Sequence, residues 1–380
     1  GGAPLFSIYR GKKETQAAND IMNTSFSMLC LTGVILMVVG MLLIRPILIL
    51  FGASEGALAY ACPYMMLYLI GTLPSMIAVG MNPFINAQGY SLTGMLSVAI
   101  GAAANLVLDP LFIFTLDMGT AGAALATGLS QFISFCILLW MCNHQDSCIS
   151  ISIRKFRPKL AIYREVLYGG IPSLGRQGIA SVATILMNFM CQPYGDAAIA
   201  AMSIVSRFMF FINSVIIGFG QGFQPVCSYC FGAGLYDRVK KACWFCIRVS
   251  TIILLVLSVI SFPAARSIIT LFRRNDPTVI EIGTLALRLQ LITLPLQGAV
   301  IMGNMMPQSI GYGFRATLVS TARQGIFLIP LLTIMTYTIG LLGIQCAQPL
   351  ADIATFILSL FVIRGIFKEF PEDASSFAAQ

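Results

Sequence analysis

The sequence predicts an all-α protein that crosses a membrane many times and consists of two similar halves. Of its 380 residues, 57% are hydrophobic and only 10% are charged, whereas soluble domains carry about 25% charged residues. Apolar segments long enough to cross a bilayer, roughly 20 residues each, recur along the whole chain. Residues of the same type also recur at a constant spacing of 221 positions. Together these patterns favour two six-helix lobes, with about ten of the expected twelve spans present.

Ten apolar segments set the expected order of spans. They cover residues 22–45, 59–82, 91–115, 120–142, 166–192, 198–230, 245–267, 279–305, 316–339 and 343–365. The connecting segments are short except for 143–165, which is rich in Arg and Lys. We therefore expect an N-terminal lobe at 1–142, a cytoplasmic linker at 143–165, a C-terminal lobe at 166–367 and a cytoplasmic tail at 368–380.

The distribution of basic residues predicts the orientation in the membrane. Lys and Arg accumulate on the cytoplasmic side of membrane proteins. If the first polar segment is cytoplasmic, 14 basic residues fall on that side, and only Arg45, Arg266, Arg273 and Arg274 fall on the outer side. The net charge of +8 is therefore a property of the loops and gives no indication of nucleic-acid binding.

The repeat is visible in short motifs. Thr72-Leu-Pro74 matches Thr293-Leu-Pro295, and Gly119 and Gly122 match Gly340 and Gly343. The offset spans six helices, an even number, so the two halves should share one orientation and be related by an axis along the membrane normal. The spans at 166–192 and 198–230 open the second half. Their counterparts would precede residue 1, so we expect this sequence to lack the first helix and most of the second.

The first candidate site is Asn105-Leu-Val-Leu-Asp109-Pro110, inside an apolar segment. A carboxylate in the membrane is costly and is a functional hypothesis by default. Asn105 lies one helical turn before Asp109 and shares its face. On the next span, Thr127 and Gln131 are also four residues apart, at depths close to those of Asp109 and Asn105. These four side chains predict a site for Na⁺ or a proton; alternatively, Asp109 caps a neighbouring helix.

The second half offers a different polar set. Asp352 occupies the repeat position of Gln131, and Arg323 on the preceding span lies at a similar depth. An ion pair between them would offset the cost of both charges, either to lock the helices together or to take part in transport. Candidate substrate-cavity residues on the spans that open this half are Arg176, Gln177, Asn188 and Arg207.

Other chemistries are less compatible with the sequence. The pairs Cys227-x-x-Cys230 and Cys243-x-x-Cys246 imitate a zinc pattern, but they sit at helix ends in apolar sequence, so we disfavour a metal site. The single histidine, His144, lies in a polar loop. A hydrolase would need a base at membrane depth. We therefore expect no enzyme activity and no cofactor.

Several segments resemble the MATE (multidrug and toxic compound extrusion) transporters, and the likeness extends over the whole chain. The motifs that carry it are residues 1–12, 105–114, 118–127, Gly220-Gln-Gly-Phe-Gln-Pro225, Ser320-Thr-Ala-Arg-Gln324 and Gln348-Pro-Leu-Ala-Asp352. The resemblance implies an antiporter that exports cationic amphipathic compounds in exchange for Na⁺ or H⁺. It also implies a bacterial inner, or plasma, membrane location. We expect a monomer.

The resemblance also assigns roles to particular residues. One branch of the family has a cation site made of an Asn, an Asp and a Thr, whose positions match Asn105, Asp109 and Thr127, together with an Asp on the first helix, which lies outside this sequence. Another branch uses carboxylates of the C-terminal lobe. Here the corresponding helix carries Arg176 and Gln177, so that second site should be absent or altered.

Two alternatives remain open. A flippase for lipid-linked precursors would share the two-lobed fold, but it would need a large basic cavity. A membrane scaffold or receptor that transports nothing would not explain the intramembrane carboxylates or the duplication.

Overall fold

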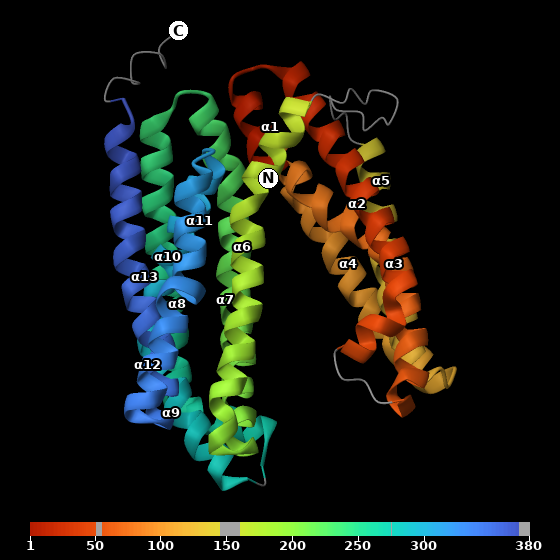
Figure 1. Cartoon of the computed structure of the whole chain (residues 1–380). Coiled ribbons are helices and arrows are strands. Elements are labelled where there is room, and N and C mark those ends of the chain that lie inside the picture. Colours follow the sequence, from red (N-terminus) through yellow and green to blue (C-terminus); the bar gives the residue numbers. More distant parts are fainter. Residues whose placement is uncertain (51–54, 145–159, 275, 372–380) are drawn as a thin grey trace. The chain divides into compact units, whose positions relative to one another are not determined.

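The computed structural model describes residues 1–50, 55–144, 160–274 and 276–371, and every regular element in them is helical (Figure 1). This is the expected all-α fold, because a bilayer offers no partner for backbone N–H and C=O groups and helices satisfy them internally. The first half consists of α1 (Gly2–Gly11), α2 (Thr15–Leu50), α3 (Glu55–Ala87), α4 (Ser91–Pro110), the π-helical turn η1 (Leu111–Thr115) and α5 (Gly119–His144).

The second half is longer. Its elements are α6 (Leu160–Cys191), η3 (Gln192–Tyr194), α7 (Asp196–Gly232), α8 (Tyr236–Phe272), α9 (Pro277–Thr293), η4 (Leu294–Leu296), α10 (Gln297–Ser309), α11 (Gly313–Thr321), the π-helical segment η5 (Ala322–Leu328), α12 (Ile329–Ile339) and α13 (Leu341–Glu369). Most of the expected linker 143–165, and the tail from residue 372, lie outside the described residues.

Nine helices in the described part of the chain are long and apolar enough to span a membrane. They correspond to nine of the ten predicted spans. The predicted span 166–192 is helical as α6, but α6 is not among the nine. Polar residues such as Arg164, Glu165, Arg176 and Gln177 lie along this helix, which lowers its mean hydropathy.

The internal repeat is also present in the backbone. α2 begins at Thr15 and α8 at Tyr236, which is the 221-residue offset. The helices before them end alike, since Lys13 and Gly234 both have positive φ, at 62° and 74°. Lys13 and Gly234 are likewise 221 residues apart.

A second turn also occurs in both halves, at a spacing one residue longer than 221. The turn between α3 and α4 contains Gly89 at φ 97°, and the turn between α10 and α11 contains Gly311 at φ 87°. Asn82 donates to the carbonyl of Gly94 at 2.8 Å across the first turn. Asn304 donates to the carbonyl of Ala316 at 2.9 Å across the second. The repeat therefore preserves a specific turn and its hydrogen bond.

The helices form two compact units, one of residues 14–166 with Gly2 and one of residues 167–380 with Gly1 and residues 3–13. In the first unit α3 packs against α2, α4 and α5, and α4 packs against α5. Gly71 of α3 lies so close to Gly128 of α5 that a Cβ on Gly71 would stand 2.7 Å from the Gly128 Cα. Glycine at this position is what allows the two helices to approach.

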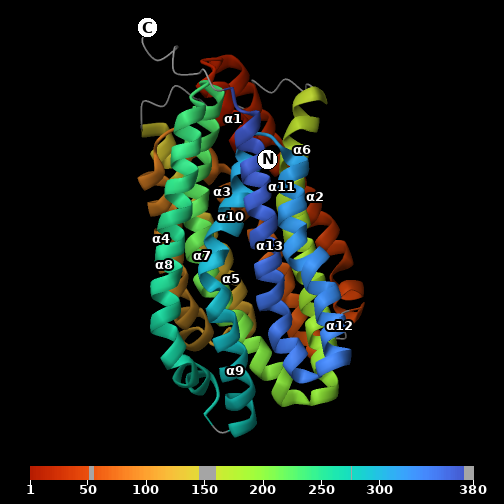
Figure 2. The same ribbon diagram turned by 90° about the vertical axis from the view of Figure 1, so that its left-hand side faces the viewer.

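In the second unit α10 is the central helix. It packs against α7, α8, α11 and α13, and Figure 2, seen from a direction at right angles to Figure 1, also shows it among these neighbours. Most of its residues are buried, including the polar Gln297 and Asn304. Buried amides require partners, so α10 supplies polar groups to the interior of this unit.

Candidate functional site

The structure brings the first predicted pair together on α4. The Asn105 Nδ2 donates to the Asp109 Oδ1 at 3.3 Å, and both residues are half-buried. Pro110 ends α4, and η1 follows at once. A π-helical turn re-aims side chains and occurs often at functional sites. Asp109 therefore sits at an irregular point of its helix, with one donor holding its carboxylate.

The other two predicted ligands lie on the neighbouring helix. α5 packs against both α4 and η1, so Thr127 and Gln131 are on the expected element, half-buried. The Thr127 hydroxyl donates to the carbonyl of Ala123 in its own helix at 3.0 Å. Within the described ranges, the only side-chain hydrogen bond of the Asp109 carboxylate is the one from Asn105. The four-residue cation site therefore stays a prediction.

The second predicted pair forms directly. The Arg323 Nε donates to the Asp352 Oδ1 at 2.7 Å. The Asp352 side chain is fully buried, and that of Arg323 is 22% exposed. Arg323 lies in η5, so this charge, like Asp109, sits beside π-helical backbone. A buried pair persists only when further hydrogen bonds satisfy it.

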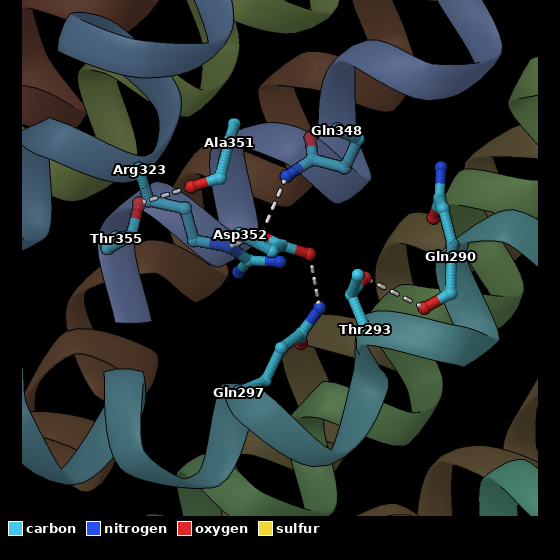
Figure 3. A network of polar contacts seen from close by, with 8 residues as sticks. All are labelled: Gln290, Thr293, Gln297, Arg323, Gln348, Ala351, Asp352 and Thr355. Atoms are coloured by element: carbon cyan, nitrogen blue, oxygen red, sulfur yellow. Dashed lines mark hydrogen bonds and ion pairs between the residues drawn. The ribbon is translucent and has the colours of Figure 1, made fainter. Parts of the chain in front are cut away.

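Two amides complete this network, which Figure 3 shows around the carboxylate. The Gln297 Nε2 of α10 donates to the Asp352 Oδ2 at 2.9 Å. The Gln348 Nε2 of α13 donates to the Oδ1 at 3.1 Å. Asp352 thus accepts hydrogen bonds from three side chains on three elements, η5, α10 and α13.

Sequence reasoning missed both amides as members of the network. Gln348 had a usable signal, because it precedes Asp352 by four residues, as Asn105 precedes Asp109. Gln297 is 55 residues from Asp352, and only the packing of α10 against α13 brings it near.

A cavity of about 630 Å³ opens in the second unit. This volume lies in the range of small-molecule sites. All four predicted cavity residues, Arg176, Gln177, Asn188 and Arg207, line it, and so does Arg323. Further amides in the lining are Asn213, Gln290, Asn304, Gln324 and Gln348, and its apolar part includes Met187, Met202, Met209, Phe210, Ile217 and Val300.

The cysteine pairs lie in apolar surroundings. Cys227 and Cys243 are fully buried, and Cys246 is also buried. Across the described ranges, no three His, Cys, Asp or Glu side chains are grouped so that they could hold a metal ion. These thiols are part of the apolar core of the second unit.

Long apolar helices, a duplicated architecture, polar groups at helix irregularities and a small-molecule cavity define a multi-pass membrane transporter. The MatE family model matches residues 1–111 and 172–334, most of the chain, and the protein belongs to this family. The family consists of transporters, not enzymes. Its members include bacterial multidrug exporters, which agrees with a location in the plasma membrane.

Curated relatives are similar along almost the whole chain. The multidrug export protein MepA of Staphylococcus haemolyticus is 25% identical over 376 residues, which are 99% of this chain and 82% of that protein. MepA of Staphylococcus saprophyticus is 24% identical over 363 residues, 96% of this chain and 80% of that protein. These matches favour a drug exporter over a lipid-precursor flippase.

Solved structures share the fold. The Vibrio cholerae MATE transporter VcmN, in its bent form, has a TM-score of 0.89 at 20% identity, covering 97% of this chain and 83% of that one. An outward-facing multidrug resistance MATE transporter has a TM-score of 0.91 at 23% identity, covering 97% and 83%.

Proposed function

We propose that the protein is a secondary active antiporter, which exports amphipathic drugs or toxic compounds in exchange for Na⁺ or H⁺ by alternating access. The observation that carries this proposal is the Asn105–Asp109 pair, a carboxylate on a membrane-spanning helix held by an amide at 3.3 Å. An intramembrane carboxylate of this kind is costly, and such residues typically mark the path of an ion or a proton.

The coupling ion would bind at Asp109 with help from the neighbouring helix. Asn105 offers an amide oxygen, and Thr127 and Gln131 offer further oxygens on α5, which packs against α4 and η1. Oxygen ligands of this type suit a hard cation or an exchangeable proton. Coupling requires the ion to bind two conformations of the transporter unequally, and the π-helical turn after Asp109 is a place where helix geometry can change.

The transported compound would bind in the cavity of the second unit, as a multidrug exporter requires. Methionine and phenylalanine side chains adapt to ligands of different shape, and both occur in its lining. The sequence led us to expect cationic amphipathic compounds, and this stays a prediction, because the described lining residues include no carboxylate to pair with a cation. We expect one chain to transport as a monomer, because each unit contains its own candidate site.

Replacement of Asp109 by Asn tests the coupling. In inside-out vesicles, export is measured as uptake of ethidium into the lumen. Uptake driven by a Na⁺ or H⁺ gradient should fall to background in the variant, because Asn keeps the shape of the side chain but loses its charge. Parallel gradients of each ion show which one drives transport. Asp117→Asn is the matched control. Asp117 is exposed, and its φ of 52° is one that Asn adopts readily.

The control variant should transport like the original protein, and both variants should reach the membrane in equal amounts. Gradient-driven efflux that continues undiminished in Asp109→Asn would overturn the assignment of the ion site.

A further inference from the structure

The cavity of the second unit is unusual in its charge. Its lining contains three guanidinium groups, Arg176 of α6, Arg207 of α7 and Arg323 of η5, and no Asp or Glu. A site made to hold an organic cation would present a carboxylate or a cluster of aromatic faces instead. The side chains around this cavity therefore favour a negatively charged group.

One carboxylate contacts residues of the lining, and it already has partners. Asp352 accepts from Arg323, Gln297 and Gln348, and its side chain is fully buried behind the lining. This carboxylate offsets one of the three positive charges. Within the described part of the chain, neither Arg176 nor Arg207 has an ion pair or a side-chain hydrogen bond. Two guanidinium groups thus face the cavity without a counter-charge.

The remaining polar groups add hydrogen-bonding capacity. The Asn213 Oδ1 is buried and has no hydrogen-bond partner among the described residues. Asn213 lines the same cavity as Arg207, which lies six residues earlier on α7. An unpartnered buried polar atom beside a cavity is explained by a ligand or by water that fills it. The cavity therefore has a polar part with unused hydrogen-bonding groups and an apolar part of methionine, phenylalanine and aliphatic side chains.

We infer that this cavity binds the oxyanion group, in the first instance a carboxylate, of an amphipathic compound, with Arg176 and Arg207 as its anchors. Guanidinium groups bind carboxylates through paired, charge-assisted hydrogen bonds. The apolar body of the compound lies against side chains such as Met187 and Phe210. That such compounds are the transported substrates rests on the proposed export function. A zwitterion with a carboxylate uses both anchors, whereas a compound that is only cationic, such as ethidium, contacts the apolar part of the cavity and gains nothing from the two guanidinium groups.

Two dyes that differ in one group test this inference. Rhodamine B has a free carboxylate, and its ethyl ester has the same ring system without that negative charge. Binding is measured by fluorescence anisotropy in nanodiscs of phosphatidylcholine, with no ion gradient. The original protein should bind rhodamine B about tenfold tighter than the ester, which corresponds to one good charge-assisted contact. Equal binding, or tighter binding of the ester, would overturn the inference.

Variants locate the effect. Arg176→Gln together with Arg207→Gln should abolish the preference for rhodamine B and leave binding of the ester unchanged, which also shows that the variant is folded. Arg207→Lys keeps the charge and should keep most of the preference. The matched control is Arg248→Gln, because Arg248 is exposed on α8 and does not line the cavity. A preference that survives in the double variant would contradict the assignment of these two anchors.

Nanodiscs that also contain phosphatidylglycerol tell whether a lipid phosphate reaches the same groups. If phosphatidylglycerol weakens rhodamine B binding to the original protein but not to the double variant, the site is supported, and a lipid headgroup is a second ligand with an oxyanion.

Transport in vesicles separates this inference from the proposed function. A protein that prefers rhodamine B in binding but moves neither dye would refute export and leave the site standing. A protein that exports both dyes without any preference would refute the site and leave export standing.

Discussion

Gly11 and Gly232 each lie against the other's helix in a reciprocal contact. A Cβ on Gly232 would overlap the carbonyl oxygen of Ile8, and a Cβ on Gly11 would overlap that of Tyr229. Ile8 and Tyr229 are 221 residues apart, as are the two glycines. The ends of α1 and α7 therefore cross at equivalent points of the repeat. The contact is self-complementary in the way of a two-fold interface.

Gly232→Ala should lower the stability of the protein. The new methyl group has no space against the Ile8 carbonyl, which is backbone and cannot turn away, and overpacking of this kind costs about 1–3 kcal/mol. Thermal unfolding in detergent measures the effect. Gly222→Ala on the same helix is the control, because a Cβ there meets nothing within 4 Å. Equal melting temperatures for the two variants would show that the crossing is not tight.

Asp352→Asn should destabilise the second unit strongly. The substitution leaves the Arg323 guanidinium, whose Nε donates to the carboxylate at 2.7 Å, without its counter-charge, and breaking one side of a buried pair costs about 3–5 kcal/mol. Adding Arg323→Gln should recover part of this loss, because the orphaned charge is then removed.

A double-mutant cycle on unfolding measures the coupling between Arg323 and Asp352. Strictly additive effects would contradict the prediction. Transport by the double variant separates the two roles left open by the sequence. Recovery of transport along with stability indicates a structural lock, and loss of transport in a stable double variant indicates a part in the transport cycle.

Thr127→Ala should weaken ion-driven transport without unfolding the protein. If the hydroxyl is a ligand of the ion, its removal should raise the ion concentration at half-maximal efflux by about tenfold, as loss of one hydrogen-bonding contact to a charge does. Thr284→Ala is the matched control, since Thr284 of α9 also donates to the carbonyl four residues before it, at 2.6 Å. Equal ion dependence in both variants would remove Thr127 from the site.

The fold was predictable because its signals are local or periodic. Apolar length predicted ten spans, nine of which are long and apolar enough to cross a membrane in the described residues, and constant spacing indicated the duplication. The apolar segment 166–192 correctly predicted the helix α6, but α6 is not among the nine, and several of its polar residues line a cavity. The π-helical backbone of η1 and η5 has no comparable sequence signal, since Pro110 and Pro330 mark a break in regularity but do not specify its form.

The sites were predictable where charge alone decides the partner. Arg323 and Asp352 had to neutralise each other in an apolar interior, and they do. Neutral amides such as Gln297 and Asn213 do not require a charged partner. Their position therefore depends on how α10 and α7 pack. From the sequence, Arg176 and Arg207 were placed in the cavity, but Arg323 was assigned only to its pair with Asp352. Arg323 faces the cavity as a third guanidinium only because η5 brings it beside Arg176 and Arg207.

The most direct test of antiport is to let the substrate drive the ion. In sealed vesicles with no ion gradient, an imposed gradient of a transported dye should move Na⁺ or H⁺ in the opposite direction, because coupling between two binding sites is reciprocal. The movement is followed with a sodium- or pH-sensitive dye. The account predicts counter-movement of the ion in the original protein and in Asp117→Asn, and none in Asp109→Asn. Dye transport by the original protein with no movement of either ion would contradict it.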